Sequence, residues 1–209
     1  MSQFIESIKV ENKKVFLLDR HQKRVNTTFS HFGQSDPIDL TKIFKELDHD
    51  EEGLYKLKIT YDLTGNITTR MIPYAMSEIA GFELVENNEY NYSFKFEDRK
   101  ELEKMKILAK APEIIIVKNN HITDSSYSNL IFKKGKDWFT PATFLLNGVQ
   151  RQHLLESKKI KEAEITLQNL GDYSHFQIIN AMNTFDATFS YPLDKIKNLP
   201  KSAVVNTFN

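Results

Sequence analysis

The chain has 209 residues, of which 40% are hydrophobic and 11% aromatic, so it can bury the core of one large domain or two small ones. Basic and acidic residues balance at 28 each, which gives no overall field toward nucleic acid or an anionic membrane surface. The absence of cysteine excludes disulfides, thiolate metal sites and thiol nucleophiles. No segment has the apolar run of roughly 18 residues that a membrane span needs, and the first residues lack a signal-peptide pattern. We therefore expect a cytoplasmic protein with no nucleic-acid or membrane partner.

The first part of the chain predicts a small α+β unit. Alternating and apolar runs predict a hairpin over 4–18 and a second hairpin over 57–72. Between them, the helical spacing of Val25, Phe29 and Phe32 predicts a helix from Arg20 to near Gly33, and a second helix is expected after Pro37. A polar cluster at 87–91 then marks the expected boundary. The predicted domains are residues 1–88, abbreviated, and residues 89–209.

The second part predicts further strands and helices. The apolar periodicity and the turn residues predict a short strand to Phe96 and a helix from Asp98 to about Leu108. They also predict strands over 113–118, through Ile122, over 127–132 and at 138–139, and a helix after Gly148. No internal repeat or low-complexity tract is present, which argues against solenoids and disordered arms.

Three segments stand out when they are taken together. They are Lys95-Phe-Glu-Asp-Arg99, Thr123-Asp-Ser-Ser-Tyr-Ser-Asn-Leu130, and the stretch from Thr140-Pro141 to Leu146-Asn-Gly-Val-Gln-Arg151. Their order and spacing resemble the class IV aminotransferase and aminodeoxychorismate lyase family, and His21-Gln-Lys-Arg24 resembles the early His-x-x-Arg helix of that family. The resemblance implies a two-domain fold-type IV enzyme, similar to D-amino acid aminotransferase, that holds pyridoxal 5′-phosphate (PLP) in the interdomain cleft and forms a homodimer.

Lys95 is the expected catalytic residue. An aldehyde cofactor needs one amine that holds it as an imine and later moves protons, and a desolvated lysine can do both. The alternative is an ordinary solvated lysine. The flanking Asp98 and Arg99, together with the two later motifs, favour the catalytic interpretation.

Asp124 is the expected partner of the pyridine nitrogen, which must stay protonated if the cofactor is to accept electrons. The family usually has Glu at this position, so the shorter side chain is a departure. The alternative is an acidic residue that begins a β-turn. Asn129 ends the same motif and is a further expected cofactor contact.

The phosphate group needs cations and free backbone donors, and a helix N-terminus supplies the donors. Gly148, Val149 and Gln150 lead into a predicted helix and fit that description, although an ordinary loop-to-helix junction is the alternative. Arg24 is a second phosphate candidate, since a guanidinium binds an oxyanion bidentately. Ala181 and Met182 resemble the segment that closes over the phosphate in relatives, and Met182 is alternatively plain core.

The reaction is less constrained than the cofactor. We expect an aminodeoxychorismate lyase, which eliminates pyruvate to give 4-aminobenzoate for folate synthesis, because the segments 95–99, 124–129 and 180–182 resemble that branch more than the branched-chain transaminases. Lys100, which stands where several transaminases have a Tyr, slightly favours the same branch. The alternatives are a class IV aminotransferase acting on an amino acid and a 2-oxo acid, and a non-catalytic PLP binder. Lys56, Lys58 and Arg70 are candidates for binding substrate carboxylates, or else the wet face of a ribbon.

Two other enzyme classes are excluded by spacing. The six His residues include no His-x-x-x-His pair with an acidic partner, so we expect no metal site. Ser125 and Ser126 lack a Gly-x-Ser-x-Gly context, which argues against a serine nucleophile.

Overall fold

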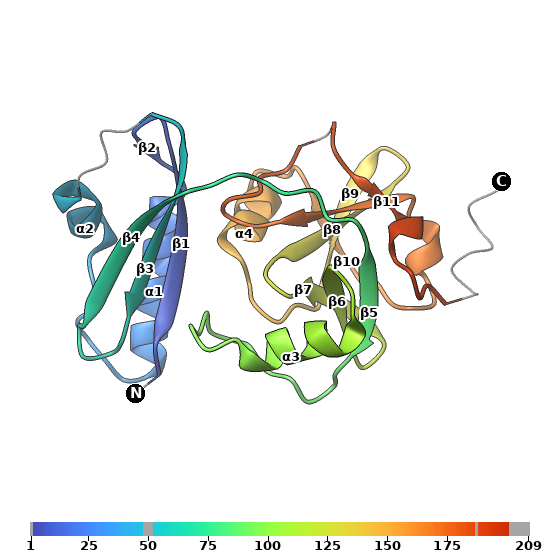
Figure 1. Ribbon diagram of the computed structural model, residues 1–209, viewed down its shortest axis with the longest axis horizontal. Coiled ribbons are helices and arrows are strands. Elements are labelled where there is room, and N and C mark those ends of the chain that lie inside the picture. Colours follow the sequence, from blue (N-terminus) through green and yellow to red (C-terminus); the bar gives the residue numbers. More distant parts are fainter. Residues whose placement is uncertain (1, 48–51, 187, 201–209) are drawn as a thin grey trace. The chain divides into compact units, whose positions relative to one another are not determined.

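The computed structural model describes residues 2–47, 52–186 and 188–200. Contacts along the chain define two compact units: Met1–Met76 with Phe94–Asp98, and Ser77–Ser93 with Arg99–Asn209 (Figure 1). The expected domain boundary between residues 88 and 89 stays a prediction. Within the described ranges, no helix has both the length and the apolar character that crossing a membrane requires.

The first unit is an antiparallel sheet with two helices. Its strands β1 (Phe4–Glu11), β2 (Lys14–Val15), β3 (Leu54–Tyr61) and β4 (Ile67–Pro73) take the order β2-β1-β3-β4, and its helices are α1 (Leu18–His31) and α2 (Leu40–Glu46). Strand alternation places one side chain of every two on the helix side. Ile8 and Leu57, paired across β1 and β3, therefore pack with Val25 and Phe29 of α1.

In its described residues, the second unit has an eight-stranded mixed sheet, two α-helices and two short 3₁₀ helices. Its elements are β5 (Phe82–Glu86), α3 (Lys100–Ala109), β6 (Glu113–Lys118), β7 (His121–Ser125), β8 (Asn129–Lys134), β9 (Asp137–Pro141), α4 (Val149–Glu156), β10 (Lys161–Ala163), η1 (Leu170–Asp172), β11 (His175–Ile179), β12 (Tyr191–Pro192) and η2 (Leu193–Lys195). The main path runs β10-β9-β8-β7-β6-β5, while β11 pairs with β8 and β12. The pairs β5–β6 and β9–β10 are parallel.

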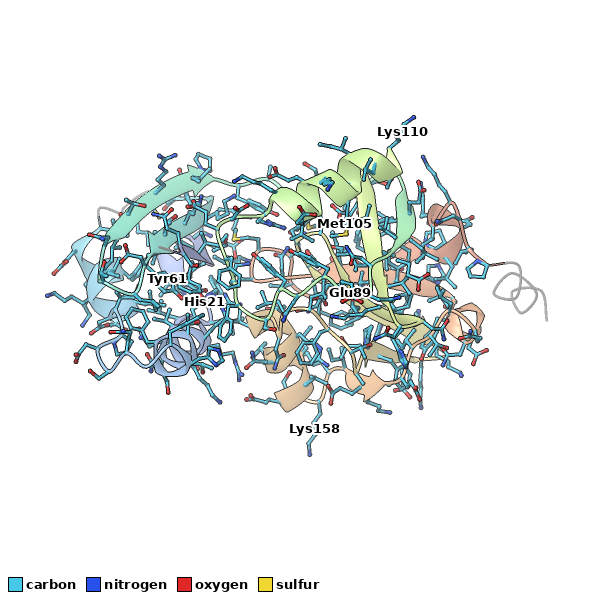
Figure 2. All side chains as sticks on the ribbon, turned by 90° about the horizontal axis from the view of Figure 1, so that it is seen from below. His21, Tyr61, Glu89, Met105, Lys110 and Lys158 are labelled. Carbon is cyan, nitrogen blue, oxygen red and sulfur yellow. The ribbon has the colours of Figure 1, made fainter. Side chains whose placement is uncertain are left out.

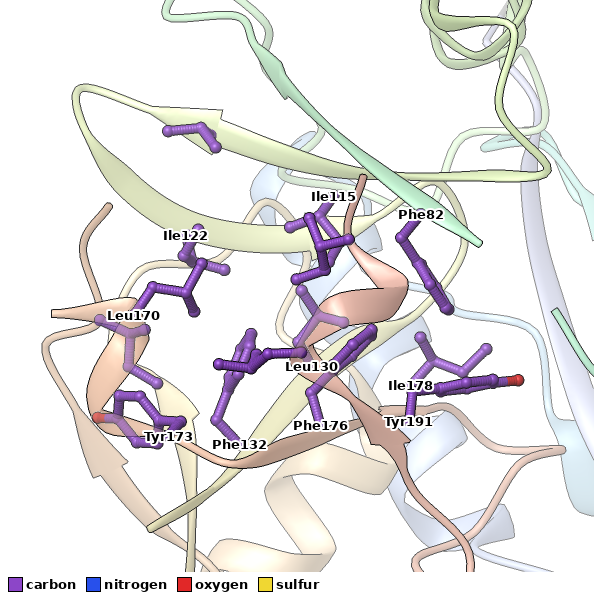
Figure 3. Packing of buried hydrophobic residues seen from close by; sticks show 14 of the residues in the cluster. Phe82, Ile115, Ile122, Leu130, Phe132, Leu170, Tyr173, Phe176, Ile178 and Tyr191 are labelled. Carbon is purple, nitrogen blue, oxygen red and sulfur yellow. The ribbon is translucent and has the colours of Figure 1, made fainter. Parts of the chain in front are cut away.

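Aromatic rings fill the core of the second unit. Figure 3 shows Phe82, Phe132, Phe176 and Tyr191 among branched aliphatic side chains. The ring of Phe176 lies 4.8 Å from that of Phe82 and 5.9 Å from that of Phe132, measured between centroids. These rings contribute large apolar areas, and Phe176 meets Phe82 edge-to-face and stacks on Phe132, so the rings stabilise the packing of β8 and β11.

Most predicted elements are confirmed, and one is wrong. The hairpin predicted over 57–72, the helices near 20–33 and after Pro37, and the helix after Gly148 are present. The hairpin predicted over 4–18 is shorter than expected, because its second strand ends at Val15 and α1 begins at Leu18. The expected short strand to Phe96 is a single isolated bridge between Phe96 and Phe4. The physical reason is a local turn, in which the Phe96 amide donates to the Phe94 carbonyl and leaves no ladder to extend.

Candidate functional site

The β7–β8 hairpin sets two of the expected cofactor residues side by side. Asp124 of β7 and Asn129 of β8 are directly opposite partners in the antiparallel pair. The turn between them closes through the Ser125 amide, which donates to the Ser128 carbonyl at 2.8 Å. Because paired residues of adjacent strands project to the same face, the two polar side chains meet, and Asn129 Nδ2 donates to Asp124 Oδ1 at 2.8 Å.

Asp124 is buried, with 5% of its surface exposed, and its carboxylate is well supplied with donors. Oδ2 accepts from the backbone amides of Leu145 and Leu146 at 3.0 and 2.9 Å. Burial raises the pKa of this carboxyl from 3.8 to about 6, against the opposing effect of the hydrogen bonds from Leu146, Asn129 and Leu145. A cation placed beside Asp124 would favour its charged form, so the residue is suited to hold a protonated ring nitrogen.

Gly148 caps α4 without a side chain. No side chain caps the helix N-terminus, and Val149 and Gln150, the first two helical residues, are buried. A Cβ built on Gly148 would lie 2.1 Å from Asn129 Oδ1, so a glycine is required for Asn129 to keep its place. The uncapped amides carry the positive end of the helix dipole, which favours an anion at this end of α4.

Arg151 fixes the loop that leads into α4. Its buried guanidinium donates to Pro141 O at 3.0 Å and to Asn147 Oδ1 at 3.2 Å, and it also pairs with Glu162. Its Cζ lies 4.5 Å from the centroid of the Phe144 ring. Arg151 therefore holds both ends of the loop whose middle amides bind Asp124.

The segment around Asn180 joins the same region of the second unit. Asn180 Nδ2 donates to Ser128 Oγ at 2.7 Å, and Asn180 Oδ1 accepts from the Met182 amide at 2.8 Å. Ala181 is half-buried and Met182 buried. The structure thus brings 180–182 to the β7–β8 turn, next to Asp124 and Asn129.

Arg24 lies in the first unit, on a buried acid. Its Nε donates to Glu6 Oε1 at 2.8 Å, and its Nη2 binds Oε2 of the same carboxylate. His21 Nδ1 lies 2.5 Å from Glu6 Oε2. Glu6 and His21 are both fully buried (Figure 2 labels His21). Arg24, the predicted phosphate-binding arginine, therefore forms an ion pair with a buried carboxylate.

Lys95 lies beside the start of β1. Its carbonyl accepts from the Ile5 amide at 2.9 Å, and the Glu97 amide donates to the Gln3 carbonyl at 2.8 Å. Lys95 is half-buried. These two bonds tie its backbone to the strand that carries Glu6.

The three substrate candidates lie on the sheet face away from α1. Lys58 and Arg70 are directly opposite in the β3–β4 register, and Lys56 is two residues before Lys58 on the same face. Lys58 Nζ is 2.8 Å from Glu97 Oε1, and Lys56 Nζ lies 5.9 Å from the Tyr74 ring centroid. The carboxylate of Glu97 therefore already engages one of these cations, and their role stays a prediction.

The candidate residues of the second unit lie close to one another in the structure, and two polar residues that the sequence did not predict lie beside candidate residues. The structure brings Asp124, Asn129, Gly148 and the segment 180–182 together, as the motif order suggested. The missed residues are Glu6 and Ser128. A signal for Glu6 was present, because a charged residue at an inward position of an alternating strand needs a buried partner; for Ser128 no such signal exists.

The chain matches the Amino-transferase class IV family over residues 3–185. A match over most of the chain shows the family, and the chain belongs to it. The mixed α+β fold is that of fold-type IV enzymes, so the predicted fold class, enzyme class and cofactor, PLP, are confirmed at the level of the family. The expected interdomain cleft and the roles of individual residues stay predictions.

Three proteins illustrate the similarity. An uncharacterized protein of Haemophilus influenzae Rd is 31% identical over 190 residues, which are 88% of this chain and 99% of the relative. The crystal structure of a candidate 4-amino-4-deoxychorismate lyase from Haemophilus somnus 129PT is 32% identical, with a TM-score of 0.82 over 88% of this chain and 98% of that one. An aminotransferase from Brucella abortus, solved with its cofactor PLP, is 16% identical, with a TM-score of 0.66 over 91% and 79%.

Proposed function

We propose that this chain is a PLP-dependent enzyme that acts as an aminodeoxychorismate lyase, releasing pyruvate and leaving 4-aminobenzoate. The observation that carries the cofactor assignment is Asp124, a buried carboxylate that accepts hydrogen bonds from the neutral donors Asn129, Leu145 and Leu146. The choice of reaction is supported by the 32% identity to the H. somnus candidate lyase over nearly the whole of that chain.

The residues of the second unit fit the cofactor's two polar ends. Asp124 would hold the proton on the pyridine nitrogen, and Asn129 would keep the Asp124 carboxylate in orientation through its 2.8 Å bond. The amides of Val149 and Gln150 at the uncapped start of α4 would bind the phosphate. Ala181 and Met182, fastened to the β7–β8 turn through Asn180, would close over it.

Two residues of the first unit complete the proposal. Arg24 would add a guanidinium to the phosphate contacts. Lys95 would hold the cofactor covalently through its amine and, once a substrate amine has replaced it, would take the proton from the carbon that bears that amine. PLP when bound supplies the electron sink that stabilises the negative charge left on this carbon. Lys95 would then return a proton as the products form.

The substrate of the proposed lyase carries carboxylates, so its site needs cationic side chains that bind them. Lys56, Lys58 and Arg70 are our candidates because they share one face of the first sheet. Lys58 would exchange its contact with Glu97 for a substrate carboxylate. We also retain the proposals of a homodimer and of a cytoplasmic location, which the family resemblance and the composition support.

The reaction is tested by following both products. PLP-loaded protein is mixed with 4-amino-4-deoxychorismate, pyruvate is measured with lactate dehydrogenase, and 4-aminobenzoate is measured by fluorescence. We expect equal amounts of the two products from the wild type and from a Lys100→Ala control, and none from Lys95→Ala. Conversion of the cofactor to pyridoxamine phosphate by an amino acid, without pyruvate release, would select the aminotransferase alternative. Cofactor binding without either reaction would select the non-catalytic binder.

A further inference from the structure

Glu6 is a buried acid that the proposed chemistry does not use. It lies on β1 at a position facing α1, between Phe4 and Ile8, and none of its surface is exposed. An isolated carboxylate in such a place would be strongly destabilising. Glu6 is instead met by three donors on α1: Arg24 Nε at 2.8 Å, Arg24 Nη2, and His21 Nδ1 at 2.5 Å.

These contacts fix the protonation states of the cluster. Burial alone would raise the pKa of Glu6, but the charge of Arg24 and the hydrogen bond from His21 outweigh burial and lower it to about 2. Burial, together with the charges of Arg24 and Lys95, lowers the pKa of His21 below its usual value against the opposing hydrogen bond and charge of Glu6. A neutral His21 therefore donates its Nδ1 hydrogen to Glu6, and Glu6 remains a carboxylate at any neutral pH.

The His21 ring has no second task within the described structure. Its Nε2 is buried and makes no hydrogen bond there. Leaving one ring nitrogen unpaired costs free energy, which the strong bond of the other nitrogen to an ionised acid offsets. The His21 ring therefore holds the Glu6 carboxylate in place, and Glu6 in turn holds the Arg24 guanidinium.

The carboxylate occupies one particular edge of the Arg24 guanidinium. Nε and the inner hydrogen of Nη2 point at the two oxygens of Glu6. The guanidinium is planar, so fixing this edge also fixes the directions of the Nη1 hydrogens and of the outer Nη2 hydrogen. An anion bound by Arg24 would therefore accept from the Nη1 hydrogens and the outer Nη2 hydrogen, whose directions are set by Glu6.

We propose that Glu6, supported by His21, is a positioning residue that orients Arg24 for the phosphate group of the cofactor. This inference rests on the proposed function, and it names the residues that make Arg24 selective for a phosphate. Glu6 touches neither cofactor nor substrate in this proposal and acts only through Arg24.

The charge of Glu6 has a second effect, which acts against phosphate binding by Arg24. The negative charge of Glu6 partly cancels the attraction of Arg24 for an anion. Orientation prevails in our account, because bidentate recognition of an oxyanion by arginine depends on the direction of its donors, and an unfixed arginine side chain loses considerable rotamer freedom on binding.

The test compares PLP with pyridoxal, which lacks the phosphate. Dissociation constants for both compounds are measured by absorbance titration for the wild type, Glu6→Gln, Arg24→Met and the double variant. We expect Glu6→Gln to weaken PLP binding by roughly tenfold, which is the lower end of the loss caused by removing a residue that orients a metal ligand, with little change for pyridoxal. In the Arg24→Met background, Glu6→Gln should cause no further loss of preference for PLP over pyridoxal.

Two outcomes would overturn the inference. If Glu6→Gln strengthens PLP binding relative to pyridoxal, Glu6 attenuates the charge of Arg24 and does not position it. If the variant weakens both compounds equally, its role is structural. Should Glu6→Gln fail to fold by circular dichroism, Glu6→Asp, which keeps the charge but shortens the reach to Arg24, replaces it with the same expected loss of preference. A wild type that binds neither compound would instead overturn the proposed function.

Discussion

At the scale of single residues, Asp124 is held in the folded chain at a cost in free energy. Its carboxyl is buried, and its pKa is raised to about 6 although three hydrogen bonds favour the charged form. A protein gains nothing in stability from such a residue at neutral pH. Strongly perturbed carboxyls of this kind are typical of functional sites, and a protonated pyridine nitrogen is the partner that would relieve the cost.

The pH dependence of stability tests this reasoning through Asp124→Asn. The raised pKa means that the folded state binds more protons than the unfolded state between pH 3.8 and about 6. The stabilising contribution of Asp124 is thus fully present below about pH 4 and is lost as the pH rises through about 6. The rise in the pKa of Asp124 corresponds to a change on the order of 3 kcal/mol in the free energy of unfolding between these pH values.

The measurement is urea unfolding of wild type and Asp124→Asn at pH 4 and pH 7.5. The variant loses its match to the Asn129 amide, a pH-independent cost of about 1–3 kcal/mol. Relative to the wild type it should nevertheless gain stability as the pH rises. A difference in free energy of unfolding that does not change with pH would contradict the raised pKa.

At the residue scale, the sequence motifs predicted which residues of the second unit lie close together, while the roles of these residues stay predictions. Asp124, Asn129 and Gly148 were selected by their spacing, and the structure joins them through one hydrogen-bonded hairpin and one close backbone approach. Glu6 escaped notice because its partners, His21 and Arg24, lie 15 and 18 residues away on another element. Only the packing of α1 on β1 brings them together.

At the scale of elements, the site depends on how β8 meets the start of α4. Asn129 Nδ2 donates both to Asp124 Oδ1 and to the Leu146 carbonyl, each at 2.8 Å. Its Oδ1 occupies the space that a side chain at position 148 would need. The absence of a side chain on Gly148 therefore permits strand, loop and helix to converge.

Gly148→Ala should disturb this junction by steric contact and not by backbone strain. The residue has φ −67 and ψ 146, which alanine adopts readily, but its Cβ would displace Asn129 and break bonds to Asp124 and Leu146. We expect a loss of about 1–3 kcal/mol in the free energy of unfolding and weaker PLP binding. Thermal and urea unfolding measure the first effect, and absorbance titration measures the second.

Asn129→Ala supplies the matched control for that variant. Removing the Asn129 amide removes the clash, so Gly148→Ala should cost clearly less in the Asn129→Ala background than in the wild type. Costs that simply add would show that the two residues do not interact, contrary to the geometry.

Element-scale prediction succeeded where periodicity or a turn marked both ends of an element. The helix after Gly148 and the hairpin over 57–72 are examples. The strands β5 and β11 were not anticipated. Both are short, and neither is joined to its main partner by a local turn: β5 is the last strand of the main path and pairs in parallel with β6, and β11 pairs with the distant β8, so they lack the pattern that identifies a hairpin.

At the scale of the whole molecule, the predicted cofactor contacts are divided between two units. Lys95 and Arg24 belong to the first unit, whereas Asp124, Asn129 and Gly148 belong to the second. The proposed enzyme therefore requires both units for one reaction. The chain covers 98% of the H. somnus structure that it resembles.

The central claim is that Lys95 holds PLP, and reductive trapping tests it most directly. Purified protein is incubated with PLP, reduced with borohydride, digested and examined by mass spectrometry, with Lys95→Ala and Lys100→Ala treated alongside. We predict an absorbance band of the bound cofactor, and a phosphopyridoxyl group on Lys95 of the wild type and of Lys100→Ala only. A protein whose absorbance ignores PLP, or a label that persists on another lysine in Lys95→Ala, would contradict the account.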